Sequence, residues 1–250
     1  MNKNRFEEQE LPYQTLEKYG LTREMIEDLP MHVLEDISMG RRSPVLPIQI
    51  EDENENVIKS RTRFAFVRMD DGKVDVVFYP VLEQSPLAEF DEAQQKQLLS
   101  GKAILADMTM PDGKKSAAFV QIDTETKQVM SAPTPVIGRN LQVLAGEMKL
   151  SNAEVKVLQG GEPLTFVMEE EPVTVGIDLN ANTGIRLCQG DEQRWREQAK
   201  REWDKYTFGC YGCWVTDDDG GLSYVPEEEY TEELWNEQKK AAGRAMASHR

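Results

Sequence analysis

The sequence predicts an α+β protein of three related units, each a helix followed by a small antiparallel meander, with a helical, aromatic-rich C-terminal tail. Three observations predict this class. A polar, helix-like run stops at glycine three times along the chain, and short apolar runs separated by turn residues follow each stop. One apolar pattern also recurs at intervals of roughly sixty residues, which is the scale of a structural repeat.

The recurring pattern is a strand-like run in which the apolar positions coincide and an aspartate closes each copy. The copies are the segments 65–70, 118–123 and 174–178, and the glycines before them are Gly40, Gly101 and Gly160. Because each set of strands alternates or is half apolar, we expect the helices to lie on one face of the sheets.

These copies divide the chain into four segments. Residues 1–85 hold the N-terminal helices and the first sheet unit, 86–148 the second repeat unit, 149–190 the third, and 191–250 the helical aromatic tail. The sequence leaves open whether the units form one domain or several.

The first segment begins with short helices. Proline near the start and glycine at the end mark a helix over 11–20, and Thr22 stands where the next helix needs a cap. The run Asp28-Leu29-Pro30 breaks that second helix, and apolar residues at helical spacing predict a third over 31–39. Strands are expected at 45–50, 63–69 and 73–79. The turn signal Asp70-Asp71-Gly72 joins the last two strands in a hairpin.

The second and third units repeat this plan. A helix that opens near Phe90 ends at Gly101, and a capping box of Ser151 and Glu154 opens the helix of the third unit. The expected strands are 103–110, 116–123 and 128–131, then 164–168, 173–179 and 184–188.

The tail differs in kind from the repeats. Residues 191–206 have a strongly helical pattern, with Trp195 and Trp203 on one face. A compact aromatic segment follows at 206–214, and a last helix is expected over 232–245.

Charge and hydropathy restrict the classes of function. A net charge of −16 disfavours direct binding to a phosphate backbone. No apolar run approaches the roughly eighteen residues of a membrane span, and the N-terminal residues lack the apolar stretch of a secretory signal. From the hydropathy we expect a cytoplasmic protein without membrane attachment. Because the charge disfavours nucleic acid, we expect the partner to be a protein.

Cys210 and Cys213 form a Cys-x-x-Cys pair and are the candidate metal ligands. A structural zinc site usually takes about four ligands, and besides this pair the chain offers only Cys188, His32 and His249. A redox pair would stand at the start of a helix beside a parallel strand, whereas this pair lies in a segment rich in glycine and aromatic residues. The favoured interpretation is two small buried thiols in a packed turn.

Aromatic residues are densest in the tail, where two interpretations compete. Most aromatic stripes belong to a core, whereas exposed members of such a cluster mark a protein-binding surface. The candidate interaction residues are Trp203, Tyr206, Tyr211, Trp214 and Trp235.

Catalytic signatures are missing from the sequence. It contains no Walker loop, dinucleotide fingerprint, G-x-S-x-G elbow or H-E-x-x-H pattern. Its two histidines leave little material for His-based catalysis. We predict no catalytic residue and no cofactor.

Two stretches resemble uncharacterised domains. The run Leu11-Pro12-Tyr13, with 16–21, 28–30 and Gly40-Arg41, resembles the N-terminal signature of a domain family found in conjugative mobile elements of anaerobic gut bacteria. The stretch 90–123 resembles a second uncharacterised domain that often accompanies it, and 203–214 is similar to the ending of such proteins. The resemblance implies an association with proteins that process mobile-element DNA, and it supplies no activity or catalytic residue.

Three classes of function follow from these observations. The leading hypothesis is a non-enzymatic accessory protein that binds other proteins, because the chain combines repeats and acidic charge with no catalytic signature. The first alternative is an acidic DNA mimic that inhibits a DNA-binding enzyme, which requires carboxylates spaced like phosphates on an elongated face. The second alternative is a metal-dependent enzyme whose site is assembled across the repeats.

Overall fold

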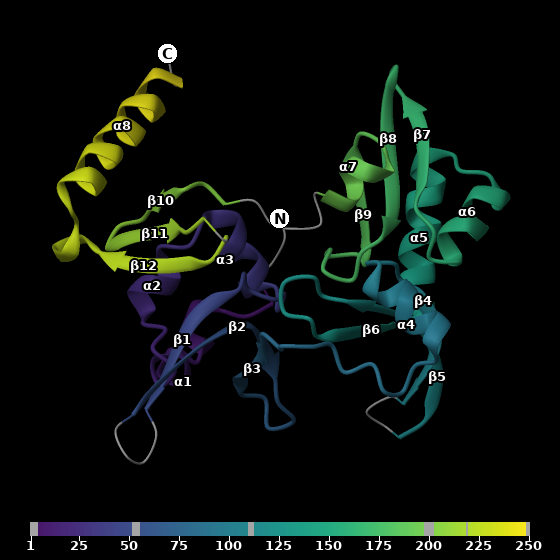
Figure 1. The fold of residues 1–250 in the computed structure, drawn as a ribbon, viewed down its shortest axis with the longest axis horizontal. Helices are drawn as coiled ribbons and strands as arrows, with labels where there is room; N and C mark the ends of the chain where they lie inside the picture. The colour runs from purple at the N-terminus through teal and green to yellow at the C-terminus, as the bar shows by residue number, and fades with distance from the viewer. Residues whose placement is uncertain (1–4, 52–55, 110–112, 198–202, 219, 249–250) are drawn as a thin grey trace. The chain divides into compact units, whose positions relative to one another are not determined.

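The computed structural model describes residues 5–51, 56–109, 113–197, 203–218 and 220–248 (Figure 1). Over these residues it confirms the α+β class, because helices accompany four three-stranded antiparallel sheets. The chain divides into two compact units. Unit 1 combines Met1–Val81 with Glu202–Arg250, and unit 2 is Leu82–Arg201.

Unit 1 contains two meanders and most of the short helices. Its helical elements in the described ranges are η1 (Glu8–Glu10), α1 (Tyr13–Glu17), α2 (Arg23–Glu27), α3 (Met31–Ser38), η2 (Glu227–Glu229) and α8 (Glu232–Ser248). Its strands are β1 (Leu46–Glu51), β2 (Val57–Arg68), β3 (Val74–Pro80), β10 (Tyr206–Phe208), β11 (Gly212–Thr216) and β12 (Leu222–Pro226). The long strand β2 pairs with β1 over its first half and with β3 over its second half.

The core of unit 1 is shared between the two ends of the chain. The N-terminal part contributes Phe6, Leu16, Leu21, Ile26, Phe64 and Phe66, among others, to one buried cluster. Trp214 and Leu222 from the C-terminal part belong to the same cluster. Trp214 is fully buried, and its indole N–H donates to the backbone carbonyl of Met25 at 3.0 Å. Residues before 82 and after 201 therefore form one folded body.

Unit 2 contains the second and third repeats. Its helices in the described ranges are α4 (Glu92–Leu99), α5 (Thr134–Met148), α6 (Asn152–Gln159) and α7 (Glu192–Glu197). Its strands are β4 (Ile104–Thr109), β5 (Lys115–Ile122), β6 (Val129–Pro133), β7 (Leu164–Met168), β8 (Glu171–Ile177) and β9 (Ile185–Gln189). The capping box of Ser151 and Glu154 is present at the start of α6, as its sequence pattern predicts.

The repeated sequence pattern corresponds to the middle strand of three of the four sheets, namely β2, β5 and β8. Gly40 and Gly101 end α3 and α4 with φ of +79° and +80°. After α6 the left-handed position belongs to Gly161, with φ +85°, and Gly160 keeps a φ of −78°. Glycine suits these stops because it carries no Cβ to clash in the left-handed conformation.

Helices cover both faces of the third sheet, which differs from the expected one-sided arrangement. Val175 packs with Leu141 of α5 and Leu158 of α6. The next residue, Gly176, belongs to the opposite face of the sheet, because successive residues of a strand alternate between the two faces. A Cβ at Gly176 would lie 2.7 Å from the ring of Trp195 on α7. Trp195 therefore closes the face that α5 and α6 leave uncovered.

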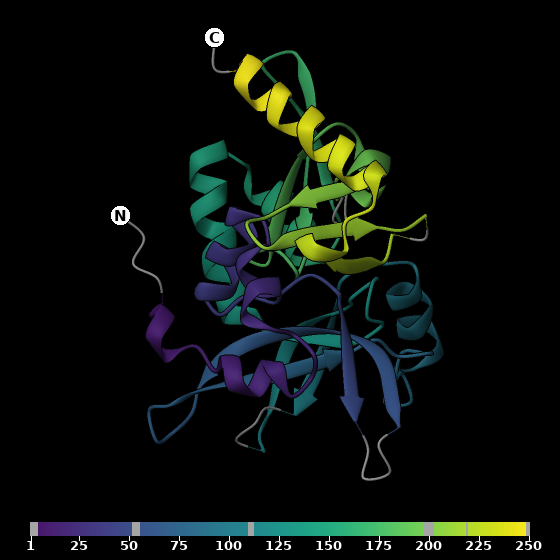
Figure 2. The same ribbon diagram turned by 90° about the vertical axis from the view of Figure 1, so that its left-hand side faces the viewer.

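The tail holds a sheet that the sequence pattern does not predict. The expected helix over 191–206 is observed as α7, residues 198–202 lie outside the described ranges, and Tyr206 begins β10. The aromatic segment 206–214 forms a hairpin, whose turn is closed by the Gly209 N–H donating to the Gly212 carbonyl at 2.8 Å. Helix α8 follows β12 after η2 and, in both ribbon views, extends beyond this small sheet (Figures 1 and 2).

The four-segment division stays a prediction about folding domains. In the structure, residues 82–85 belong with the second and third repeats in unit 2, and most of the tail belongs with the N-terminal segment in unit 1.

Candidate functional site

Asp28, which follows α2, is buried and binds the hairpin turn of the tail. Its carboxylate accepts hydrogen bonds from the Cys210 N–H at 2.5 Å, the Tyr211 N–H at 3.0 Å and the Tyr224 hydroxyl at 2.6 Å. A Cβ at Gly209 would collide with this carboxylate. Charge-assisted bonds of this kind are stronger than neutral ones. Asp28 therefore fixes the turn 209–212 against the N-terminal helices.

Burial around this network raises several pKa values. Desolvation, with the hydrogen bond to Asp28, raises the pKa of Tyr224 well above its ordinary range. Desolvation also raises the pKa of Tyr230 to about 12, and nearby Cys213 and Glu227 add to the effect. The pKa of the Cys213 thiol rises to about 11, mainly because the thiol is buried. Cys213 is therefore protonated at neutral pH.

The two candidate metal ligands have different environments. Cys210 is exposed in the turn, whereas Cys213 is fully buried in β11. The interpretation of two buried thiols in a packed turn thus fits Cys213 and not Cys210. Within the described ranges, no three His, Cys, Asp or Glu side chains are grouped so that they could hold a metal ion. His249 lies outside those ranges.

The five candidate interaction residues separate by burial. Trp214 is 0% exposed and belongs to the core of unit 1, against which Trp203 also packs. Tyr206 is half-buried, and Tyr211 and Trp235 are 49% and 38% exposed. Sequence reasoning cannot make this division, because burial of an aromatic side chain depends on partners far away in the chain.

Four aromatic rings of the tail form a continuous series that we call the aromatic strip. Its members are Tyr206, Phe208, Tyr230 and Trp235, and adjacent ring centroids are 6.1, 6.1 and 5.1 Å apart. Each of the four side chains keeps partial exposure to solvent. Tyr206 also donates from its hydroxyl to Glu233 at 3.1 Å, which links β10 to the first turn of α8. Phe208 and Tyr230 are not among the predicted interaction residues, because only the contact of β10 with the start of α8 reveals them.

The N-terminal helices of unit 1 line a groove of about 370 Å³, which we call the N-terminal groove. Leu11, Ile26 and Leu34 supply apolar walls, and Glu35 adds a carboxylate. Met31, at the start of α3, lines the groove and is 71% exposed.

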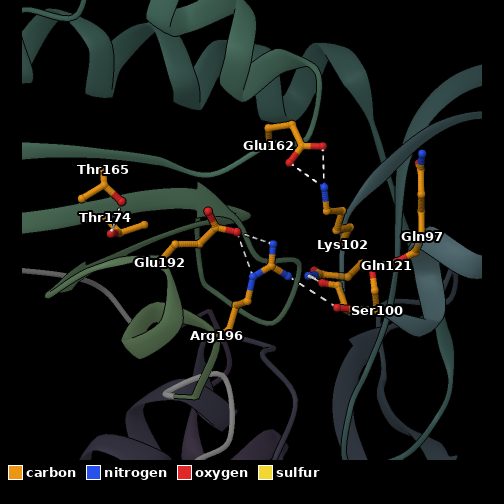
Figure 3. Close-up of polar contacts among 10 residues, drawn as sticks. Gln97, Ser100, Lys102, Gln121, Glu162, Thr165, Thr174, Glu192 and Arg196 are labelled. Carbon is orange, nitrogen blue, oxygen red and sulfur yellow. Dashed lines mark hydrogen bonds and ion pairs between the residues drawn. The ribbon is translucent and has the colours of Figure 1, made fainter.

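Unit 2 holds a cavity of about 680 Å³ at the ends of β5 and β8, which we call the unit 2 cavity. Segments separated in sequence reach it: the end of α4, the turns after β5 and β8, strand β9 and helix α7. Figure 3 shows Arg196 reaching from α7 towards Ser100 and Gln121 in this region. Sequence reasoning does not find this cavity, because no local pattern brings these segments together.

Comparison with known proteins gives a family resemblance and no activity. A family model described as a protein of unknown function (DUF4099) matches residues 6–89. No curated protein and no solved structure matches the chain. The match supports an uncharacterised domain at the N-terminal end, which is the coarse form of the resemblance inferred from the sequence. The second domain and the association with mobile elements stay predictions.

The matched range contains α1 to α3 and β1 to β3 but not the tail sheet that completes their core. In the part of the chain that the structure describes, no helix has both the length and the apolar character needed to cross a membrane.

Proposed function

We propose that this protein is a non-enzymatic accessory protein that binds another protein through the aromatic strip. The observation that carries the proposal is the strip itself, four rings in mutual contact that stay partly exposed. Aromatic side chains are enriched at the energetic centres of protein interfaces, because they bury a large area at little cost in side-chain entropy. Trp235, on the first turn of α8, is the most exposed ring of the strip.

The charge around the strip indicates the chemistry of the partner. Exposed carboxylates stand beside it on η2 and on the first turn of α8, namely Glu227, Glu228, Glu229, Glu232 and Glu233. Surfaces of opposite charge attract and orient each other before contact. A segment with lysine or arginine beside aliphatic or aromatic residues therefore fits this surface best.

Selection from a displayed peptide library tests the proposal, because a random library needs no chosen partner. The full chain serves as bait, and we expect enrichment of peptides that combine basic and apolar residues. Substitution Trp235→Ser or Tyr206→Ser should weaken the binding of an enriched peptide by about tenfold or more, as expected when an anchor residue is truncated.

Met31→Ser provides the matched control, because it removes an exposed apolar side chain from the N-terminal groove and leaves the strip intact. Loss of binding in Met31→Ser with normal binding in Trp235→Ser would assign the surface to the groove and contradict the proposal. Absence of any enriched peptide would also count against it.

The same variants separate the proposal from the DNA-mimic alternative. A DNA mimic would act through carboxylates distributed along a face, so its inhibition of a DNA-binding enzyme would survive Trp235→Ser. A protein that binds through the strip would lose its partner in that variant.

A further inference from the structure

The unit 2 cavity lies where the second and third repeats meet, and its walls are fixed by equivalent turns. After β5, the carboxylate of Asp123 accepts from the Glu125 N–H at 3.1 Å, and after β8 that of Asp178 accepts from the Asn180 N–H at 3.0 Å. Such Asx turns hold a loop in one conformation. The two turns contribute Lys127 and Asn180, among others, to the cavity wall.

Gln121 joins the two repeats beside the cavity. Its side-chain oxygen accepts from the Leu179 N–H at 2.9 Å, and its amide nitrogen donates to the Gly101 carbonyl at 3.3 Å. Figure 3 shows Gln121 beside Ser100 and Lys102. Gln121 is itself buried. A polar side chain that bridges two backbone segments makes the wall rigid, which is the condition for a preorganised binding site.

Positive charge exceeds negative charge in the cavity wall. Lys127, Arg186 and Arg196 line it, against the carboxylates of Glu83 and Asp178. The chain as a whole carries a net charge of −16, so a locally positive wall is a distinct feature of this place. A hollow lined by one excess sign concentrates ligands of the opposite sign.

Lys127 and Arg196 are the cations most available to a ligand. Lys127 takes a left-handed backbone conformation with φ +58°, and its ammonium donates to the Glu83 carbonyl at 2.7 Å and, within the described ranges, to no other acceptor. Two of its N–H bonds thus remain for another acceptor. Arg196 is held by Glu192 on its own helix, and its Nη1 reaches the Ser100 carbonyl at a weak 3.4 Å (Figure 3).

Arg186 supplies a second, independent observation. Its Nε donates to Asp178 at 2.6 Å, and its guanidinium stacks on Trp195 at 4.2 Å from the ring centroid. Both Nη atoms are shielded from solvent and donate to no acceptor within the described ranges. Buried N–H groups without an acceptor are costly, and a guanidinium fork fits the paired oxygens of a carboxylate or phosphate. Because the fork is shielded, an anion meets it only after wall side chains shift.

Apolar side chains complete the wall. Leu87, Leu98, Ile122 and Trp195 line the cavity beside the cations. Its volume of about 680 Å³ falls within the usual range for small-molecule sites.

From these observations we infer that the unit 2 cavity binds a small organic anion, in which a carboxylate or phosphate group is attached to an apolar body. Lys127 and Arg196 make the first contacts with the oxygens, and the Arg186 fork completes them as the wall adjusts. The apolar body lies against Leu98 and Trp195. This site belongs to unit 2 alone, so it stands or falls independently of the aromatic strip.

Titration of the isotope-labelled full chain with three probes tests the inference by NMR. Benzoate and phenyl phosphate carry the two candidate anionic groups on the same ring, and benzyl alcohol is the neutral counterpart. We expect at least one anion to shift the amide signals of the turns after β5 and β8, with an affinity at least about tenfold above that of benzyl alcohol, as a charge-assisted hydrogen bond provides. The anion that binds more tightly identifies the preferred group.

Charge-removing variants locate the site. Lys127→Asn tolerates the left-handed backbone, and Arg196→Gln keeps a hydrogen-bonding side chain. Each should weaken anion binding by about tenfold. Lys156→Gln removes one exposed charge from α6, outside the cavity wall, and should bind as the unmodified chain does.

Three outcomes would overturn the inference. The first is no shift with either anion, and the second is an affinity for benzyl alcohol equal to that for the anions. The third is a loss of affinity in Lys156→Gln equal to the loss in Lys127→Asn and Arg196→Gln. The amide spectrum of each variant shows whether it is folded, so two independent variants guard against a folding defect in one of them.

Discussion

Asp28 illustrates at the residue scale how one carboxylate holds distant parts of the chain together. Its bond to the Cys210 N–H spans 182 residues of sequence, and it also binds Tyr211 and Tyr224. The sequence marks Asp28 only as part of a helix break, because no local pattern identifies a partner so far away. A carboxylate suits this place because both of its oxygens accept, whereas the amide of asparagine keeps one acceptor oxygen and would turn its NH2 group towards a donor.

The substitution Asp28→Asn should destabilise unit 1. We expect the free energy of unfolding to fall by about 3 kcal/mol, because buried donors lose a charged acceptor. Tyr224→Phe removes one of the donors and should cost about 1 kcal/mol. Urea denaturation followed by tryptophan fluorescence measures both values.

Asp204→Asn, at an exposed carboxylate, is the control and should change stability by less than about 0.5 kcal/mol. Equal stability of Asp28→Asn and Asp204→Asn would show that the network contributes nothing.

The three cysteines should differ in reactivity because their burial differs. Alkylation requires the thiolate, and the pKa of Cys213 is raised from 9.0 to about 11 by burial. At pH 8 this shift alone leaves about a hundredfold less thiolate on Cys213. We expect iodoacetamide to label exposed Cys210 in the folded chain, and to label Cys213 and Cys188 only after unfolding in urea, as followed by mass spectrometry.

Rapid labelling of Cys213 in the folded chain would mean that the turn opens readily, contrary to the packing described above. Protection of Cys210 that a chelator removes would instead identify Cys210 as a metal ligand. Either result is read directly from the labelled peptide masses.

At the scale of secondary-structure elements, local signals predict most of unit 2 and fail in the tail. Capping residues such as Ser151 and hairpin turns are read from neighbouring residues, so α6 and the repeated strands follow from the sequence. Strand β10 spans only three residues, which is too short for an alternating pattern to show. The tail sheet and the unit 2 cavity both depend on contacts between distant segments.

Gly176 provides a test of how closely helix α7 packs on strand β8. A Cβ at this position would meet the Trp195 ring at 2.7 Å and 3.0 Å and Pro163 at 3.1 Å. We expect Gly176→Ala to displace α7 and to lower the free energy of unfolding by about 1–3 kcal/mol, the usual cost of overpacking. Thermal unfolding measured by circular dichroism gives the difference.

Gly146→Ala is the matched control for Gly176→Ala. Gly146 lies within α5, and a Cβ there would have open space around it. Alanine favours a helix over glycine by about 1 kcal/mol, so this variant should be more stable. Two alanine substitutions in one unit should therefore shift stability in opposite directions, and unchanged or raised stability of Gly176→Ala would contradict the packing at Trp195.

At the scale of the whole molecule, the division of unit 1 between the two ends of the chain has a consequence for the matched family region. Residues 6–89 include β2, whose Phe64 and Phe66 are buried. Trp214 and Leu222 complete the same core from beyond the matched range. In this chain the family region therefore folds with the tail as its partner.

Removal of the tail tests this dependence. A chain of residues 1–201 lacks Trp214, Leu222 and the hairpin that binds Asp28, so its N-terminal core is left open to water. We expect hydrogen exchange, followed by mass spectrometry, to show lost protection in β2, because an uncovered core no longer supports cooperative folding. Strand β5 of unit 2 should keep its protection, since its core partners such as Leu98 and Ile104 are all retained.

A chain that ends at Lys239 removes most of α8 but keeps the tail sheet, and its β2 should remain protected. Full protection of β2 in the chain 1–201 would show that the N-terminal segment folds without the tail and would contradict this dependence.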